Sequence, residues 1–198
     1  ILETTYTFPA NTLSQNRTYY WKVIATDSFG AYRVCEKDFR FNVLDRSRAE
    51  SYDGIVSVWV FSGLPENGYI FVNKISNEQN SIIEAAKSDA LKDRLIKTLP
   101  SDVYRVAVYD VNGEVIDVKS INLRITFSYP DTDRDGYYDP EFAPVENLKI
   151  AYLDEAYHRW SLPTKTQVLD KDYNKVTTEV DHLSLFTIVA TDVPQKLL

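Results

Sequence analysis

The sequence contains few of the residues on which several kinds of functional site depend. It has one cysteine, two histidines and six glycines among 198 residues. One cysteine excludes an internal disulfide framework, and two histidines exclude a zinc site with three histidine ligands. No glycine-rich phosphate-binding loop is present, and no apolar run is long enough for a transmembrane helix.

The chain also lacks methionine and any charged-then-apolar leader, so we expect a fragment or processed product. Its 29 acidic residues exceed its 22 basic ones, which gives a formal charge of −7. This acidic balance argues against a nucleic-acid-binding protein, because such proteins normally present a basic face. Apolar residues make up 44% and charged residues 26%, which is typical of a globular chain and argues against disorder.

The residues that are abundant favour β-structure. Fourteen tyrosines and nine phenylalanines occur with many valines, isoleucines and threonines, in short runs separated by turn residues. This pattern predicts a mostly β protein, an antiparallel β-sandwich of immunoglobulin-like architecture with one short helix. We expect strands in residues 1–44, a polar linker over 45–54, and a second sandwich domain over 55–198.

One segment has the pattern of a helix. Ser81 and Glu84 have the spacing of a capping box, apolar residues follow at helical spacing, and Pro100 ends the segment. We therefore predict a helix at roughly 81–97. It would serve either as a lid or partner helix, or as a plug for an open end of the sandwich with its apolar stripe toward the core.

The first 44 residues resemble part of a known family of extracellular domains. The resemblance rests on Leu13, Thr18-Tyr19-Tyr20-Trp21, Val23 and Ala25, which look like the last three strands of a fibronectin type III domain. In such sandwiches a tyrosine at about the place of Tyr19 bonds to the backbone across a corner. The family has seven strands, so we expect upstream chain or pairing with the second domain to complete this one and protect its sheet edge.

The clearest chemical signal is the acidic segment at residues 131–141. It holds five acidic side chains and one arginine. Alternating aspartates can turn their carboxylates to one side of a curling loop, and Ca²⁺ prefers six to eight oxygen ligands of this kind. Gly136 stands where a calcium loop needs a sharp turn. The predicted ligands are Asp131, Asp133, Asp135, the carbonyl of Tyr137, Asp139 (through water) and Glu141.

This segment departs from the helix–loop–helix calcium loop, because its twelfth position is Phe142 and because Pro130 and Pro140 disfavour flanking helices. It is more similar to the aspartate-rich calcium loops of thrombospondin type 3 repeats and bacterial surface proteins. That resemblance implies bound Ca²⁺, whereas Mg²⁺ tends to keep its waters. The alternative is a solvated acidic turn with no ion.

A second signal lies near the end of the chain, at Asp181-His182-Leu183-Ser184. With the apolar strands around it, this motif resembles β-sandwich domains of bacterial surface proteins and the self-cleaving domains of adhesion receptors. The resemblance implies that His182 is a base, Ser184 a nucleophile, and Leu183-Ser184 the scissile bond. In the alternative interpretation, the two side chains only satisfy each other or the backbone at a strand junction.

Other residues suggest less specific roles. Trp21, Trp59 and Trp160 could form a platform for a sugar, although their positions favour a role as core anchors. His158 is expected at the surface or in packing. Cys35 is expected to be a small buried residue in a strand, and Asn16 begins a short glycosylation-type tripeptide.

Together these observations predict a non-enzymatic, calcium-stabilised structural or adhesion module of an extracellular or cell-surface protein. Its partners would be neighbouring domains of the same polypeptide and, at the cell surface, a protein or glycan ligand. We expect no nucleic-acid partner and no membrane span in this chain. Self-cleavage at Ser184 and the binding of a carbohydrate or protein ligand stay as the two alternatives.

Overall fold

The computed structural model describes residues 17–34, 39–43, 45–75, 83, 84, 86, 96–99, 101–139 and 143–191. The chain divides into two compact units, Ile1–Asp45 and Arg46–Leu198. Residues 1–16, which include Leu13 and Asn16, and Cys35 lie outside the described residues. Among the helices that are described, none is long and apolar enough to cross a membrane.

The smaller unit contains two antiparallel strand pairs. β1 (Arg17–Trp21) pairs with β4 (Phe39–Val43), and β2 (Ile24–Thr26) pairs with β3 (Tyr32–Val34). Asp27-Ser28-Phe29-Gly30 form the turn between β2 and β3. Asp27 Oδ1 accepts the amide hydrogens of Phe29 and Ala31 at 2.9 Å each, and Gly30 has a φ of +87° that suits glycine.

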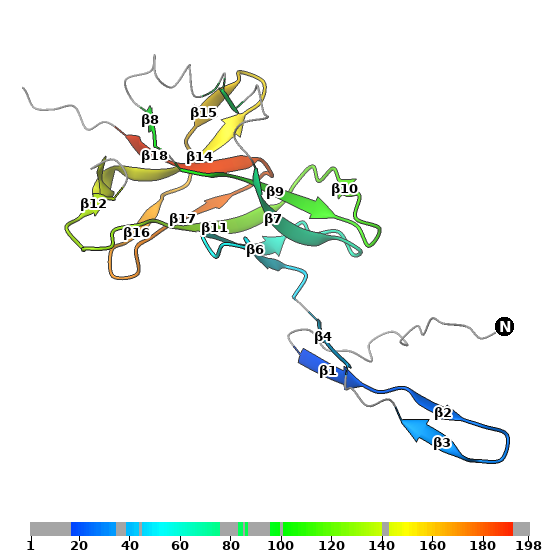
Figure 1. Ribbon diagram of the computed structural model, residues 1–198. Coiled ribbons are helices and arrows are strands. Elements are labelled where there is room, and N and C mark those ends of the chain that lie inside the picture. The colour runs from blue at the N-terminus through cyan, green and yellow to red at the C-terminus, as the bar shows by residue number, and fades with distance from the viewer. Residues whose placement is uncertain are drawn as a thin grey trace, which may run out of the picture. The chain divides into compact units, whose positions relative to one another are not determined.

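The larger unit consists of two antiparallel sheets packed face to face, so the predicted β-sandwich is confirmed (Figure 1). The five-stranded sheet has the order β16–β17–β11–β6–β5. Its strands are β5 (Arg48–Glu50), β6 (Val56–Ser62), β11 (Asn122–Ser128), β16 (Val168–Asp170) and β17 (Lys175–Val180).

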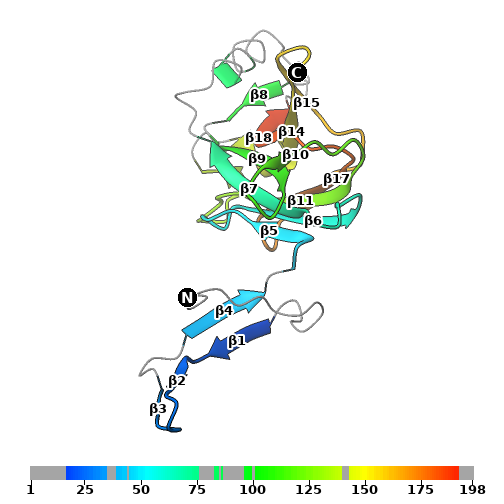
Figure 2. The same ribbon diagram turned by 90° about the vertical axis from the view of Figure 1, so that its right-hand side faces the viewer.

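The seven-stranded sheet forms the other layer, and the turned view shows its strands β8, β14 and β18 on the side away from β5 and β6 (Figure 2). β9 and β18 lie at its centre, and β7 pairs along the whole length of β9. Its strands are β7 (Tyr69–Ile75), β8 (Ile96–Thr98), β9 (Val103–Tyr109), β10 (Val115–Ile116), β14 (Leu148–Asp154), β15 (Arg159–Ser161) and β18 (Leu185–Thr191). A short pair, β12 (Tyr137–Tyr138) with β13 (Ala143–Pro144), precedes a 3₁₀-helix at Val145–Asn147.

The main core lies between the sheets and follows from the alternation of side chains along each strand. In β6, Val56, Val58 and Val60 are buried, whereas the residues between them are exposed. Beside β6 in the same sheet, β11 contributes the buried Leu123, Ile125 and Phe127. Phe186 and Ile188 of β18 pack in the same core from the other sheet. Removing apolar surface from water stabilises the folded state by about 25 cal/mol per Å², and this is the main favourable contribution to such a core.

A second apolar cluster lies against the seven-stranded sheet and includes the described part of the predicted helix. Ile83, Glu84 and Ala86 are helical, and Ile83 and Ala86 are fully buried. They pack in one cluster with Trp160, Leu185 and Val189. This arrangement agrees with an apolar stripe directed at the chain's own core. The predicted end of the helix was wrong, because Ile96 and Lys97 belong to β8, which pairs with β18. Residues 87–95 of the predicted helix lie outside the described residues.

The predicted linker over 45–54 was also wrong for most of its length. Arg48–Glu50 form β5, an edge strand paired with β6, and residues 46–198 belong to one compact unit. Two further backbone hydrogen bonds hold the start of this segment, from Val60 to the carbonyl of Ser47 and from Ile70 to that of Arg46. The segment is polar because an edge strand exposes one face and one edge to water.

Candidate metal centre

The acidic loop follows β11 and is anchored at its first residues. The amide of Tyr129 donates to the carbonyl of Asn174 at 2.9 Å, and the side-chain amide of Asn174 donates to the carbonyl of Asp131 at 3.2 Å. Asn174 lies in the turn between β16 and β17 with a φ of +52°, a conformation that asparagine tolerates better than most residues. The amide of Asp139 donates to the carbonyl of Pro130 at 3.2 Å, which closes the loop.

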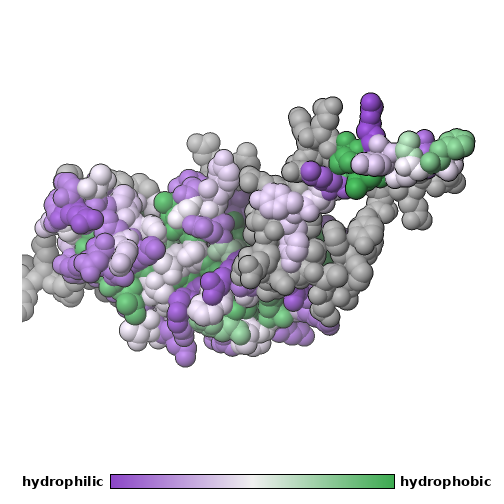
Figure 3. Space-filling model, turned by 90° about the horizontal axis from the view of Figure 1, so that it is seen from below, coloured by the Kyte–Doolittle hydropathy of each residue, from purple (hydrophilic) through white to green (hydrophobic). Residues whose placement is uncertain are grey.

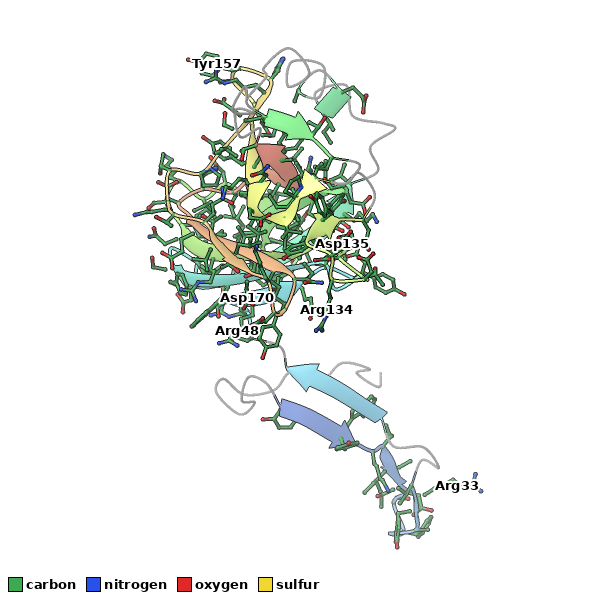
Figure 4. The ribbon with its side chains drawn as sticks, turned by 90° about the vertical axis from the view of Figure 1, so that its left-hand side faces the viewer. Arg33, Arg48, Arg134, Asp135, Tyr157 and Asp170 are labelled. Carbon is green, nitrogen blue, oxygen red and sulfur yellow. The ribbon has the colours of Figure 1, made fainter. Side chains whose placement is uncertain are left out.

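Inside the loop, two residues with positive φ turn the backbone sharply. Arg134 has a φ of +59° and Gly136 one of +85°, so glycine stands where the sequence predicted a tight turn. Asp133 Oδ1 accepts the amide hydrogen of Asp135 at 3.3 Å, and Asp135 Oδ1 accepts that of Tyr137 at 2.8 Å. Arg134 is exposed and extends away from the larger unit, as Figure 4 shows.

Three carboxylates of the loop come together. Asp131, Asp133 and Asp139 each offer one oxygen, and these oxygens lie within 4.8 Å of one another. Asp139 is also held by its own loop, because its Oδ2 accepts hydrogen bonds from the amide of Thr132 at 2.9 Å and from its hydroxyl at 2.5 Å. Like charges at this separation repel one another unless a cation or protons neutralise them, so the group could hold a metal ion.

Asp131 is the least usual member of this group. Only 8% of the residue is exposed, and its Oδ1 is buried without a hydrogen-bond partner. Buried carboxylates are normally paired, hydrogen-bonded or bound to a metal, because removing the charge from water is costly. Asp131 thus has a buried oxygen without a partner and also belongs to the group of three carboxylates that could hold a metal ion.

The hydroxyl of Tyr129 is a second buried oxygen without a hydrogen-bond partner. Burial raises the pKa of Tyr129, and the negative charges of Asp131, Asp170 and Glu146 raise it further. These carboxylates therefore make the potential negative at this end of the sandwich, and Lys171 Nζ pairs with one of them, Glu146 Oε1, at 2.9 Å. A bound cation would relieve this potential.

The predicted carboxylate ligands thus divide into three groups. Asp131, Asp133 and Asp139 come together, and Asp139 was predicted at a ligand position that is often bridged by water. Asp135 is not in the group, and its Oδ1 is used by the amide of Tyr137. Glu141 is outside the described residues. The contacts of Asn174 and Tyr129 with the loop were not predicted, because they join parts of the chain that are more than 40 residues apart.

His182 and Ser184 lie near each other in sequence, but the hydrogen bonds of their side chains go to other partners. The hydroxyl of Ser184 donates to the carbonyl of Leu153 at 2.9 Å, and Nδ1 of His182 lies 3.0 Å from Asp181 Oδ1. The imidazole packs edge-on against Tyr152, with 4.4 Å between the ring centroids, and its Nε2 is buried without a hydrogen bond. In this arrangement the histidine packs against an aromatic ring and the serine ties two strands.

The three tryptophans differ from the prediction that all are core anchors. Trp160 is buried at 4% exposure, but Trp59 is 40% and Trp21 45% exposed. Trp59 faces outward because its neighbours Val58 and Val60 face the core. On the outer face of the five-stranded sheet, the guanidinium of Arg48 lies 4.6 Å from the Trp59 ring centroid and that of Arg124 lies 5.9 Å away. This side of the larger unit, seen in Figure 3, mixes hydrophilic and hydrophobic side chains.

Comparisons with protein-family models, with curated proteins and with solved structures found no match for this chain.

Proposed function

We propose that the chain is a non-enzymatic, calcium-stabilised module of a modular extracellular or cell-surface protein. The ion would join the loop after β11 to the body of the sandwich, which would stiffen the end of the domain where the loop and the β16–β17 turn meet. Such a module would act as a spacer or adhesion unit between neighbouring domains of the same polypeptide. The resemblance of residues 1–44 to a fibronectin type III domain supports this setting.

One observation carries the proposal: Asp131, whose Oδ1 is buried without a hydrogen-bond partner, belongs to a group of three carboxylates that each offer one oxygen within 4.8 Å of the others. Oxygen-only ligands favour Ca²⁺ or Mg²⁺ over zinc or copper. Ca²⁺ is favoured over Mg²⁺ because it accepts an irregular set of carboxylates and carbonyls, whereas Mg²⁺ requires near-ideal octahedral geometry. Sites in extracellular modules commonly bind Ca²⁺ at about 0.1–1 mM, which suits a partly exposed loop.

The test is thermal unfolding by calorimetry with Ca²⁺, with Mg²⁺ and with a chelator. An ion at about 100 times its Kd stabilises the folded state by about 2.7 kcal/mol. For a protein of this size we expect Ca²⁺ to raise Tm by about 5–10 °C. Mg²⁺ should raise it much less.

Two variants sharpen this test. Asp131→Asn should abolish the rise with Ca²⁺ while leaving the chelated protein as stable as before or more so, since it removes a buried unpaired charge. Asp172→Asn changes the net charge equally at an exposed turn and should keep the full response. Equal Tm values with Ca²⁺ and chelator in the unsubstituted chain would refute the proposal.

A further inference from the structure

The outer face of the five-stranded sheet carries a row of large, exposed side chains that crosses four neighbouring strands. In order across the sheet the row consists of Arg48 (β5), Trp59 (β6), Arg124 (β11) and Glu179 (β17). Each member is the register partner of the next, and all four are exposed because the residues beside them in each strand turn toward the core. Arg48 projects from the outer side of the sheet, as Figure 4 shows.

Contacts within the row hold its side chains in place. The guanidinium of Arg48 lies 4.6 Å from the ring centroid of Trp59, and Arg124 Nη2 lies 2.9 Å from Glu179 Oε1. The ring of Phe61 packs edge-on against Trp59, with 4.7 Å between the centroids. Side chains that are already ordered lose less conformational freedom when a partner binds. Tryptophan and arginine are also the residues that most often dominate the binding energy of protein interfaces.

The row has a direction, which determines the partner that fits it. A positive charge, Arg48, stands at the β5 end, and a negative charge, Glu179, stands at the β17 end, with Trp59 and Arg124 between them. A uniformly acidic surface would be repelled by Glu179 and a uniformly basic one by Arg48. The complementary surface presents the same kinds of side chain in the reverse order. A second copy of this sheet, rotated by 180° about an axis parallel to the strands, presents that order.

We propose that the chain pairs with a second copy of itself through the outer face of the five-stranded sheet, around a two-fold axis between β6 and β11. Arg48 then faces the partner's Glu179, and Trp59 faces the partner's Arg124. The same two contacts recur on the other side of the axis, because a two-fold interface uses the same surface on both copies. Packed sheets lie about 10 Å apart, a distance that long side chains from both faces fill. This inference does not depend on the proposed calcium site.

The size of the face sets the strength that we expect for this pairing. The longest strands of the sheet, β6 and β11, have seven residues each and therefore span about 24 Å, while five strands side by side span about 19 Å. The face is thus at most about 450 Å² in each copy, or about 900 Å² in the pair. Stable complexes usually bury more than about 1,200 Å². We therefore expect a weak pair that forms with rising concentration.

Sedimentation equilibrium of the full chain, from about 10 μM to about 1 mM, tests the pairing. The average mass should rise toward twice that of one chain. Trp59→Ala should weaken the association at least tenfold. Phe71→Ala, at a similarly exposed aromatic residue of the other sheet, is the control and should leave the association unchanged. The mass of a single chain throughout would overturn the inference, and so would a mass that rises well past two chains, since a two-fold pair is closed.

A charge exchange tests the predicted order of the row. Arg48→Glu places a carboxylate opposite the partner's Glu179, and Glu179→Arg places a guanidinium opposite the partner's Arg48. Each variant alone should associate at least tenfold more weakly than the unsubstituted chain, because like charges then face each other twice. An equal mixture of the two variants should associate at least tenfold more tightly than either alone, because both facing pairs are again of opposite charge.

Lys119→Glu, at an exposed turn, is the control for a change of charge and should leave the association unchanged. If the mixture associates no better than the single variants, the two-fold arrangement is wrong. If Trp59→Ala and Phe71→Ala weaken the association equally, the contact does not lie on the five-stranded sheet and the inference is also wrong.

Discussion

Asp53 shows how one side chain connects the two sheets. Its carboxylate accepts hydrogen bonds from the hydroxyl of Ser51 at 2.7 Å and from that of Tyr104 at 2.8 Å. Lys74 Nζ lies 3.5 Å from Asp53 and 2.6 Å from Asp102. Tyr104 belongs to β9, while Ser51 and Asp53 lie in the turn between β5 and β6, so this network crosses from one sheet to the other.

The titration of Asp53 gives a prediction for stability against pH. Burial raises the pKa of Asp53, but hydrogen bonds from Ser51, Tyr104 and the amide of Ile55, with the charge of Lys74, bring it below its ordinary value of 3.8. Because the pKa of Asp53 is lower in the folded chain than in the unfolded chain, ionised Asp53 stabilises the fold at pH values above its unfolded-state pKa. This stabilisation is lost as the pH falls through the folded-state pKa. The carboxylate network should therefore stabilise the fold at neutral pH and lose this effect in acid below about pH 4.

We predict that Tyr104→Phe destabilises the chain by about 1–3 kcal/mol at pH 7, because it removes a hydrogen bond to a charged group. The difference from the unsubstituted chain should shrink as the pH falls below about 4, where Asp53 becomes protonated in both proteins. Urea unfolding at several pH values measures this. Tyr173→Phe, at an exposed position, is the control. A difference that is independent of pH would contradict the assigned role of Asp53.

Ser184 gives a second prediction at the residue scale. Its hydroxyl donates to the carbonyl of Leu153, a residue of the neighbouring strand β14, rather than to an imidazole. We therefore expect mass spectrometry of freshly made protein to show the intact chain. Ser184→Ala should also give an intact chain, lighter by the one oxygen atom that the substitution removes. A fragment beginning at Ser184, lost in Ser184→Ala, would show that self-cleavage occurs.

At the scale of elements, most strands were predictable and the exceptions have physical causes. The bounds of strand β9 were predictable, because Val103–Tyr109 is rich in residues that favour strands and the Asp110-Val111-Asn112-Gly113 turn ends it. β5 was missed because a short polar edge strand has no apolar alternation. Its contact with β6 is between paired residues of the two strands, since the guanidinium of Arg48 lies over the ring of Trp59. β8 was missed because its pairing with β18 joins residues about 90 positions apart.

The side chain of Gln167 forms hydrogen bonds with the backbone of Ile150 at an edge of β14, a contact that no local sequence pattern indicates. Its Oε1 accepts the amide hydrogen of Ile150 at 2.7 Å, and its Nε2 donates to the carbonyl of Ile150 at 2.9 Å. The side chain thus takes the place of a neighbouring strand at one residue. It also joins the seven-stranded sheet to the segment that precedes β16 of the other sheet.

We predict that Gln167→Leu destabilises the chain by about 1–3 kcal/mol, since it leaves the buried amide and carbonyl of Ile150 without partners. Chemical denaturation measures the change. Thr166→Ala, at the exposed neighbouring residue, should change stability by less than about 0.5 kcal/mol. If the two variants were equally stable, the hydrogen bonds of Gln167 would contribute nothing measurable.

At the scale of the whole molecule, both described apolar clusters lie within residues 46–198. In the smaller unit, by contrast, large apolar side chains such as Tyr20, Phe29 and Tyr32 are 69–94% exposed. A unit whose described strands form only two-stranded pairs is marginal by itself. The stability of the chain should therefore come from the larger unit.

We predict that a chain comprising residues 46–198 unfolds cooperatively, with a Tm within a few degrees of that of the full chain. Scanning calorimetry on both proteins checks this, and the Ca²⁺ response should be retained because the acidic loop lies in the same unit. Loss of a cooperative transition in the shorter chain would show that residues 1–45 contribute to the core.

The sequence by itself determined the β-sandwich class, the sharp turn at Gly136 and the acidic loop, because these depend on side-chain alternation and on residues that are near one another in the chain. Only the tertiary structure decided which carboxylates meet, that Asp131 is buried, and that Trp59 faces outward. The physical reason is that burial and carboxylate geometry depend on contacts such as that of Asn174 with Asp131, which form only when distant strands pair.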